Sequence, residues 1–312
     1  MKDRDSPAVT AIAVLLLIGL IGAGVWLYSP DKPRDELETR YAGRPSTFLE
    51  IAGTRLHLRD TGPRDAPVLI MLHGFGSSLF TWDDWADRLS ADHRAIRCDL
   101  PGFGLTGADP TGEYTDARTI AVLLALLDHL GVKRATLIGN SMGGRVAWMF
   151  AAAHPDRVSK LVLVSPDGFA SPGIEYDKKQ DVPPMMRALP YTLPLFLLRA
   201  NLEAAYADPS RMTEVALQRT RDMTLAPGVR RAVIARMEQS VLREPGPLLA
   251  SITAPALLLW GEKDALIPIG NARDYLAAMP NARLATLPGV GHLPQEEAPA
   301  ESLVPLLAFL DG

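Results

Sequence analysis

The feature that most constrains the fold of this chain is the segment Gly139-Asn140-Ser141-Met142-Gly143-Gly144. It lies between a short apolar run at 135–139, typical of a buried strand, and a helical pattern at 142–153. A strand that reverses into a helix within so few residues strains the backbone of the central residue. Glycines on both sides remove side chains that would collide there. The segment therefore predicts a sharp turn that exposes the Ser141 hydroxyl at the end of a strand.

Apolar runs of strand length alternate with amphipathic segments along most of the chain. After a hairpin at 47–51 and 55–59, we predict strands at 68–72, 95–98, 135–139, 158–164, 256–260 and 282–287, and helices at 116–130, 142–153, 270–279 and 299–310. Such alternation is typical of a mostly parallel sheet with helices on both faces, and the hairpin adds an antiparallel start. The predicted fold class is α/β.

One stretch, residues 168–247, breaks the alternation. It has no clear strand, several helical patterns, and prolines that interrupt an apolar segment at 185–198. We predict a helical cap there, inserted into an α/β core made of residues 46–167 and 248–312. Such a cap would cover the carboxyl ends of the strands, where open α/β sheets place their ligands.

The N-terminus differs from the rest of the chain. Residues 7–29 contain no charged side chain and are mostly Ala, Val, Leu, Ile and Gly. Because a helix needs about 20 such residues to span the hydrocarbon core, we predict a transmembrane anchor within residues 1–30 and a linker over 31–45. The attached domain is then expected on the extracytoplasmic side of the membrane. A cleaved signal peptide, which would give a secreted protein, is the alternative.

Composition excludes several classes of function. The net charge is −4, and no run of five like charges occurs, so the basic surface that nucleic-acid binding requires is absent. Cys98 is the only cysteine, which rules out an internal disulfide and leaves no metal-ligand spacing. We expect Cys98 to be a small buried apolar residue, and we expect neither a metal nor another cofactor. The oligomeric state is not predicted.

The segment His73-Gly74-Phe75-Gly76 directly follows a predicted strand. Reaction at an acyl carbon places negative charge on an oxygen, which two aimed backbone N–H groups stabilise. The N–H groups of Phe75 and Met142 are the candidates, and we interpret His73 as a structural histidine that braces the loop. Substrate contacts are expected from Phe75, Asn140, Met142 and Leu266.

The Ser141 hydroxyl needs a base, and the chain has six histidines. His292 is the strongest candidate, because it lies in a loop after a predicted strand, at the sheet edge where Ser141 is expected. Asp264 follows another strand and is the candidate acid that orients the imidazole, in the order nucleophile, acid, histidine. Asp167, also after a strand, is the competing acid. Asp99 is interpreted as a turn former.

These segments together make the chain resemble α/β-hydrolases over about residues 46–312. The resemblance rests on five segments in order, HGFG (73–76), DLPGFG (99–104), GNSMGG (139–144), WGEKD (260–264) and GVGH (289–292). It implies ester hydrolysis through an acyl-enzyme, with Ser141, Asp264 and His292 as the catalytic residues and with no metal or organic cofactor.

Finer similarities leave the substrate open. With its apolar N-terminus, HGFG and SPDGF (165–169), the chain is similar to membrane-anchored monoacylglycerol-lipase-like hydrolases, which implies a lipid-like or medium-chain ester. The apolar residues at 185–198 would then line an acyl pocket, contact the bilayer surface or form the core of the cap.

Two alternatives remain. GNSMGG is also similar to carbon–carbon bond hydrolases of the 2-hydroxy-6-oxo-dienoate type. Their substrate is a carboxylate, which predicts a cap arginine such as Arg187 or Arg199 facing Ser141. The other alternative is a non-catalytic binding protein with a hydrolase fold, against which the intact set of site residues argues.

Overall fold

The computed structural model describes residues 7–170, 175–179 and 181–312, so the first six residues of the predicted anchor lie outside the described residues. Its centre is a sheet in the order β1-β2-β4-β3-β5-β6-β7-β8. The strands are β1 (Ser46–Ile51), β2 (Thr54–Thr61), β3 (Val68–Leu72), β4 (Arg94–Cys98), β5 (Ala135–Asn140), β6 (Val158–Val164), β7 (Ala256–Gly261) and β8 (Ala282–Leu287). β2 pairs antiparallel with β1 and β4, and all other pairs are parallel. The predicted α/β sheet with an antiparallel start is confirmed.

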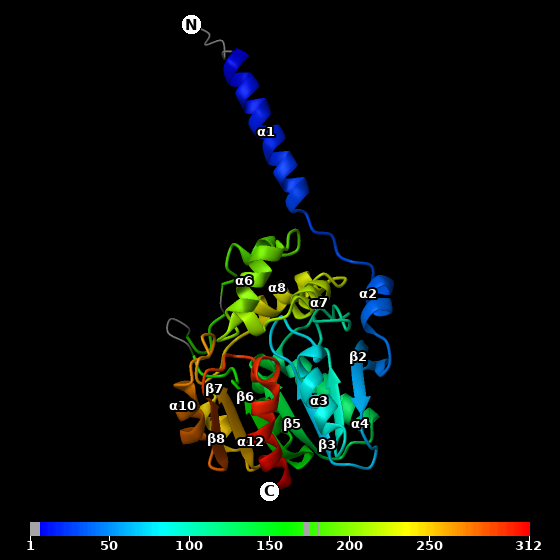
Figure 1. The fold of residues 1–312 in the computed structure, drawn as a ribbon, viewed down its shortest axis with the longest axis vertical. Coiled ribbons are helices and arrows are strands. Elements are labelled where there is room, and N and C mark those ends of the chain that lie inside the picture. The colour runs from blue at the N-terminus through cyan, green and yellow to red at the C-terminus, as the bar shows by residue number, and fades with distance from the viewer. Residues whose placement is uncertain (1–6, 171–174, 180) are drawn as a thin grey trace.

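Helices cover both faces of this sheet (Figure 1). One face packs against α3 (Asp83–Leu89) and α12 (Pro299–Asp311). The other packs against α4 (Asp116–His129), α5 (Met142–Ala153) and α10 (Asn271–Ala278). The inner strands β3 and β7 are therefore buried on both sides, which explains why they read as continuous apolar runs, whereas the edge strand β8 is only partly buried.

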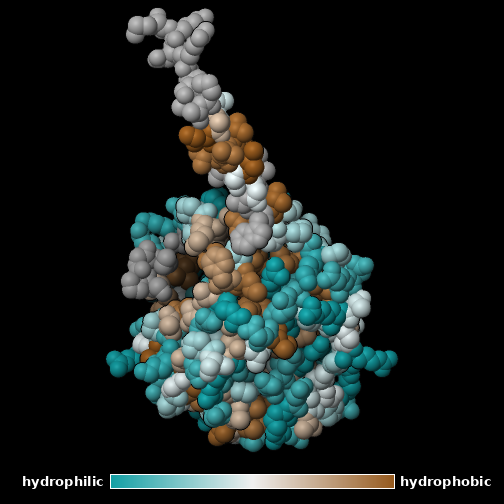
Figure 2. Space-filling view, turned by 45° about the horizontal axis from the view of Figure 1, so that its top comes forward, coloured by the Kyte–Doolittle hydropathy of each residue, from teal (hydrophilic) through white to brown (hydrophobic). Residues whose placement is uncertain are grey.

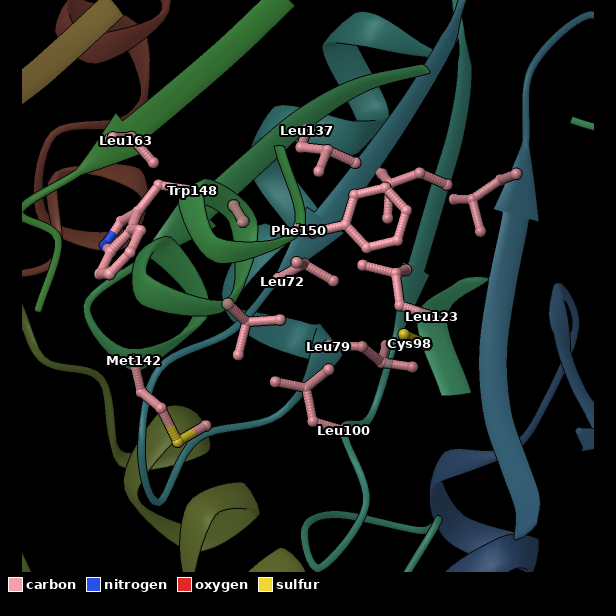
Figure 3. Close-up of a cluster of buried hydrophobic side chains, with 14 of the residues drawn as sticks. Leu72, Leu79, Cys98, Leu100, Leu123, Leu137, Met142, Trp148, Phe150 and Leu163 are labelled. Atoms are coloured by element: carbon pink, nitrogen blue, oxygen red, sulfur yellow. The ribbon is translucent and has the colours of Figure 1, made fainter. Parts of the chain in front are cut away.

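Strand β3 shows how one strand serves two cores. Leu69 and Met71 belong to the cluster with α3 and α12, whereas Ile70 and Leu72 belong to the cluster with α4 and α5. All four side chains have no exposed surface. Successive side chains of a strand point to opposite faces, so one strand supplies both layers. Figure 3 shows the second cluster, to which α5 contributes Phe150.

The chain between β6 and β7 contains the helices α6 (Leu195–Glu203), α7 (Glu214–Thr224), α8 (Val229–Gln239) and α9 (Gly246–Ala250). In Figure 1, α6, α7 and α8 lie between α1 and the sheet. This is the stretch predicted as a helical cap, and we use that name for it below.

Helix α1 (Pro7–Leu27) stands away from the body of the molecule (Figure 1), and hydrophobic residues run along it (Figure 2). Judged on the residues that the structure describes, no helix is long and apolar enough to cross a membrane. The transmembrane anchor therefore stays a prediction. The end of α1 contacts the cap, where Thr192 Oγ1 donates to the Leu27 carbonyl at 2.7 Å and Ser29 N–H donates to the Tyr191 carbonyl at 2.9 Å.

The predicted linker, residues 31–45, contains the helix α2 (Arg34–Tyr41). α2 is attached to the cap through the buried carboxylate of Asp222 in α7. Arg40 approaches this carboxylate to 3.0 Å and the Tyr41 hydroxyl donates to it at 2.7 Å. Leu37, only 1% exposed, faces the core. Helix α2 was not predicted from the sequence, because its contacts come from a distant part of the chain.

Candidate active site

Ser141 is the one residue between β5 and α5, so the chain changes direction from strand to helix at this residue. Its φ of 54° and ψ of −121° are values that residues with a side chain rarely adopt. A Cβ on Gly139 would overlap with the Gly143 backbone, and a Cβ on Gly143 would overlap with the carbonyl of Leu72. The sharp turn predicted from the sequence is therefore present, and it requires glycine at both positions.

Asp264 and His292 form a buried pair beside this turn. His292 Nδ1 lies 2.8 Å from Asp264 Oδ2, with 6% and 0% of the two side chains exposed. Asp264 Oδ1 accepts the N–H groups of Leu266 and Ile267, both at 2.9 Å. These two donors fix the carboxylate so that its second oxygen faces the imidazole. With Nδ1 engaged, Nε2 is the ring nitrogen left to accept a proton.

Ser141 and His292 line the same cavity, whose volume is about 240 Å³. Phe75, Asn140 and Leu266, three of the predicted substrate contacts, line it as well. The side chain of the fourth, Met142, belongs instead to the hydrophobic core (Figure 3). Met142 is not among the residues that line the cavity, so its backbone N–H is its one remaining candidate contact.

The backbone N–H groups of Phe75 and Met142 are available as oxyanion donors. Among the described residues, no protein acceptor is hydrogen-bonded to either group. Met142 is the first residue of α5, where N–H groups have no partner within the helix and the helix dipole is positive. Both features favour the binding of negative charge next to Ser141.

His73 braces the loop that carries Phe75, as predicted. It is fully buried, its Nε2 accepts the Leu100 N–H at 2.9 Å, and its Nδ1 lies 2.8 Å from the carbonyl oxygen of Gly74. Because Nε2 is an acceptor, the proton of the neutral ring is on Nδ1, which donates to Gly74. Burial lowers the pKa of His73, which keeps the ring neutral.

The competing acid, Asp167, faces a different partner. Its carboxylate lies 2.6 Å from the guanidinium of Arg145, and its backbone N–H donates to the Ser141 carbonyl at 3.0 Å. In this structure it is therefore Asp264, and not Asp167, that is paired with His292.

Asp99, interpreted as a turn former, is fully buried and has a histidine partner of its own. Its Oδ2 lies 2.8 Å from Nδ1 of His57, and the N–H groups of Leu79 and Leu105 donate to it at 2.7 and 2.8 Å. The turn role was only part of its function, because pairing of β2 with β4 brings His57 to it. Next to it, burial raises the pKa of the Cys98 thiol to about 12, in agreement with the expected inert cysteine.

The apolar cap residues at 185–198 do not line the cavity in the described part of the chain. Met185, Tyr191 and Phe196 are instead 73%, 58% and 66% exposed. Tyr191 and Thr192 contact the chain at the end of α1. Other residues of the segment pack inward, since Leu193 is 7% exposed and Leu198 packs against the small cap cluster. The cap lines the cavity with a later set of residues, namely Asn201, Leu202, Ala205, Tyr206, Met212, Ala216 and Thr220.

Glu296 is a cavity residue that the sequence analysis missed. It belongs to α11 (Pro294–Glu297), which begins two residues after His292, and accepts hydrogen bonds from Thr81 and, at 2.9 Å, from the Tyr206 hydroxyl. Among the described residues that line the cavity, Glu296 is the only carboxylate, and there is no lysine or arginine. Its position so soon after His292 was the available signal.

The two cap arginines considered from the sequence point elsewhere. Arg187 pairs with Glu238 at 3.6 Å, and Arg199 pairs with Glu214 at 2.6 Å. Neither lines the cavity.

Residues 67–299 match the protein family described as the alpha/beta hydrolase fold. The chain belongs to this family. The hydrolase is 33% identical over 267 residues to a 2-hydroxy-6-oxononadienedioate/2-hydroxy-6-oxononatrienedioate hydrolase of Paraburkholderia phymatum, with 82% of this chain and 91% of the relative covered. It is 29% identical over 262 residues to a 2-hydroxy-6-oxo-6-phenylhexa-2,4-dienoate hydrolase of Burkholderia cepacia, with 79% and 88% covered.

Among solved structures, the hydrolase is similar to the crystal structure of a membrane phospholipase A described as a novel bacterial virulence factor. The TM-score is 0.74 and the identity 24%, with 97% of this chain and 98% of the other covered. At this identity the similarity shows the fold alone. The comparisons make the protein a serine-based hydrolase, and the names of its curated relatives favour the carbon–carbon alternative over a monoacylglycerol esterase.

Proposed function

We propose that this hydrolase cleaves an uncharged carboxylic ester through an acyl-enzyme formed on Ser141. The observation that carries the proposal is the charge of its cavity. Ser141 and His292 share this cavity with one carboxylate, Glu296, and among its described lining residues there is no cationic side chain that would bind an anionic substrate.

The proposed reaction follows from the contacts of the site. His292 Nε2 takes the proton of Ser141 as its Oγ attacks the carbonyl carbon, and the Phe75 and Met142 N–H groups hold the oxyanion. Asp264, at 2.8 Å from Nδ1, stabilises the imidazolium, which then protonates the departing alcohol. Water attacks the acyl-enzyme by the same route and releases the acid. Each oxyanion donor contributes roughly 10²–10³ in kcat.

The size and lining of the cavity favour a short or medium acyl chain. Its volume of about 240 Å³ lies below the roughly 300–1,000 Å³ of pockets that hold drug-sized ligands. Leu202, Met212 and Leu266 supply apolar surface, and Asn201 and Thr220 supply polar groups. An uncharged acyl chain with a small polar leaving group fits this lining.

Carbon–carbon bond hydrolysis is the second candidate. The names of the relatives in Paraburkholderia phymatum and Burkholderia cepacia favour it. A 2-hydroxy-6-oxo-dienoate is a carboxylate, however, and it would meet Glu296 rather than an arginine in this cavity. Because of the charge of the cavity, we favour an ester over a dienoate as the substrate.

One experiment tests both candidates. The protein and its Ser141→Ala variant are treated with a fluorophosphonate probe, then assayed with p-nitrophenyl esters from acetate to laurate and with a 2-hydroxy-6-oxo-dienoate. We expect labelling of the unsubstituted protein alone and an optimum between butyrate and octanoate. Turnover of the dienoate without ester hydrolysis would instead establish the second candidate. Absence of labelling and of any turnover would reject both.

We further propose that residues 1–30 anchor the hydrolase to a membrane, with the hydrolase domain on the extracytoplasmic side. The support is the run of 23 uncharged residues at 7–29, with charged residues on both sides. In cells whose outer envelope has been made permeable to proteins, an externally added protease should degrade the hydrolase domain. Recovery of the full chain in the soluble fraction would contradict the anchor.

A further inference from the structure

The loop that carries His292 is bonded to the cap at two successive residues. The His292 N–H donates to the carbonyl oxygen of Ala205 at 2.7 Å. The N–H of the preceding residue, Gly291, donates to Oε2 of Glu297 at 2.7 Å. Ala205 also lines the cavity, so the backbone that holds the histidine is the backbone of a cavity wall.

Glu297 extends this connection further into the cap. Glu297 is only 3% exposed. Its carboxylate also accepts hydrogen bonds from the N–H groups of Asp208 at 2.8 Å and of Ala207 at 3.2 Å. One carboxylate thus binds three backbone donors from two segments that lie more than 80 residues apart. Hydrogen bonds to an ionised acceptor are strong, and a buried carboxylate requires them.

Close packing leaves little room between the two segments. A Cβ placed on Gly291 would lie 2.6 Å from both the Ala205 oxygen and the Ala207 nitrogen. On the other side of the histidine, Leu293 packs against the small cap cluster that contains Tyr206. The cap therefore contacts Gly291, His292 and Leu293 in turn.

We propose that Glu297 is a positioning residue that makes cap segment 205–208 and the His292 loop one rigid unit, so that the orientation of the base depends on the position of the cap. This inference rests on the role of His292 in the proposed function. It implies that a substrate that contacts Ala205 and Tyr206, which line the cavity, also affects the orientation of the His292 imidazole.

The test is Glu297→Gln, which leaves one acceptor oxygen for three backbone N–H groups, so that the NH₂ group faces either Asp208 or the pair Gly291 and Ala207. We expect kcat and the rate of fluorophosphonate labelling to fall at least tenfold while KM changes less than threefold. We also expect the low-field proton resonance of the His292–Asp264 hydrogen bond to shift or broaden. Glu301→Gln, at an exposed position of α12, is the matched control and should change none of these quantities.

Gly291→Ala is the second variant, because its methyl group separates the same two segments without removing a charge. A folded Glu297→Gln protein with an unchanged resonance and unchanged kcat overturns the inference. If Glu297→Gln does not fold, the same criteria apply to Gly291→Ala. The proton resonance can be measured without any turnover, so it tests the role of Glu297 even if the wild-type protein hydrolyses no ester. Absence of ester hydrolysis would reject the proposed function alone.

Discussion

Asp264 and Asp167 both follow parallel strands at one edge of the sheet, and they differ in the group that faces each carboxylate. Asp264 faces the His292 imidazole, with two backbone N–H groups on its other oxygen. Asp167 faces the guanidinium of Arg145. A carboxylate that orients an imidazole acts on catalysis, whereas one that pairs with a buried guanidinium acts on stability.

Substitution of the two aspartates should separate these roles. We expect Asp264→Asn to lower kcat by roughly 10⁴, because the imidazole loses the acceptor that fixes its tautomer. Asp167→Asn should keep kcat within about threefold but lower the free energy of unfolding by about 2 kcal/mol, since Arg145 loses a charged partner. Steady-state kinetics and urea unfolding measure the two effects. The reverse pattern would make Asp167 the acid.

The charge of Glu296 should govern which substrates enter the cavity. We expect Glu296→Gln to raise kcat/KM for a p-nitrophenyl ester with a terminal carboxylate by about fivefold relative to a neutral ester of equal length, because a like charge is removed. The amide oxygen can keep the hydrogen bond from Tyr206 and the amide NH₂ can donate to the Thr81 hydroxyl, so the fold should be unaffected. An unchanged ratio would show that Glu296 does not select substrates.

His73 should make stability depend on pH. Burial holds the pKa of His73 below its ordinary 6.5. As pH falls below about 6.5, the unfolded chain takes up a proton that the folded one does not, so the free energy of unfolding decreases, by at most about 1.4 kcal/mol per pH unit. Urea unfolding between pH 7.5 and 5.5 measures the slope. His73→Gln should flatten it, and the exposed His129→Gln should leave it unchanged.

At the scale of elements, the boundaries of β3, α5, β6 and β8 agree with those predicted from the sequence. β3 lies between two layers and reads as an unbroken apolar run, and α5 follows a glycine-flanked turn, so local sequence defines these two. β8 is instead a partly buried edge strand. Helix α2 escaped prediction because what orders it is Asp222 and the core around Leu37, far along the chain. Helix α3 was not predicted either, because it is short and lacks a side-chain cap.

The turn between β5 and α5 should depend on Gly143 more than on an ordinary loop glycine. The methyl group of Gly143→Ala would overlap with the Leu72 carbonyl, and we expect it to lower the free energy of unfolding by about 3 kcal/mol and to abolish labelling of Ser141. Gly112→Ala is the control, since Gly112 has a positive φ and open space around it, and should cost about 1 kcal/mol. Thermal unfolding compares the two variants. Equal losses would contradict the predicted role of the contact.

At the scale of the whole molecule, the parallel sheet explains why so much of the candidate site was predictable. Phe75, Ser141, Asp264 and His292 follow the carboxyl ends of β3, β5, β7 and β8, which meet at one edge. The contacts between the cap and this edge were not predictable, because cap residues 206–207 meet Glu296 and Glu297 of α11 only through packing of segments about 90 residues apart. Of the three places considered for the apolar segment at 185–198, the pocket is the one that it does not line in the described part of the chain: Met185, Tyr191 and Phe196 are exposed, whereas Leu193 is buried and Leu198 packs against the cap cluster.

The segment after α1 should stabilise the cap. Arg230 in α8 is 3% exposed and lies 2.6 Å from Asp31. A chain of residues 31–312 should keep kcat/KM for esters within about threefold of the full chain. A chain of residues 34–312 also loses Asp31 and Lys32, which lies 3.1 Å from Asp222, and we expect its free energy of unfolding to be about 1–2 kcal/mol lower. Equal stability of the two chains would show that neither Asp31 nor Lys32 stabilises the cap.

The contacts of the cap also define how a mechanical load would travel through this molecule. A pull on the N-terminus acts first on the bonds from Leu27 and Ser29 to residues 191–192, and so reaches the cap before any strand of the sheet. The cap in turn holds the His292 loop through Glu297. A load on the first helix therefore acts on the cap, and through Glu297 on the His292 loop, before it acts on the strands.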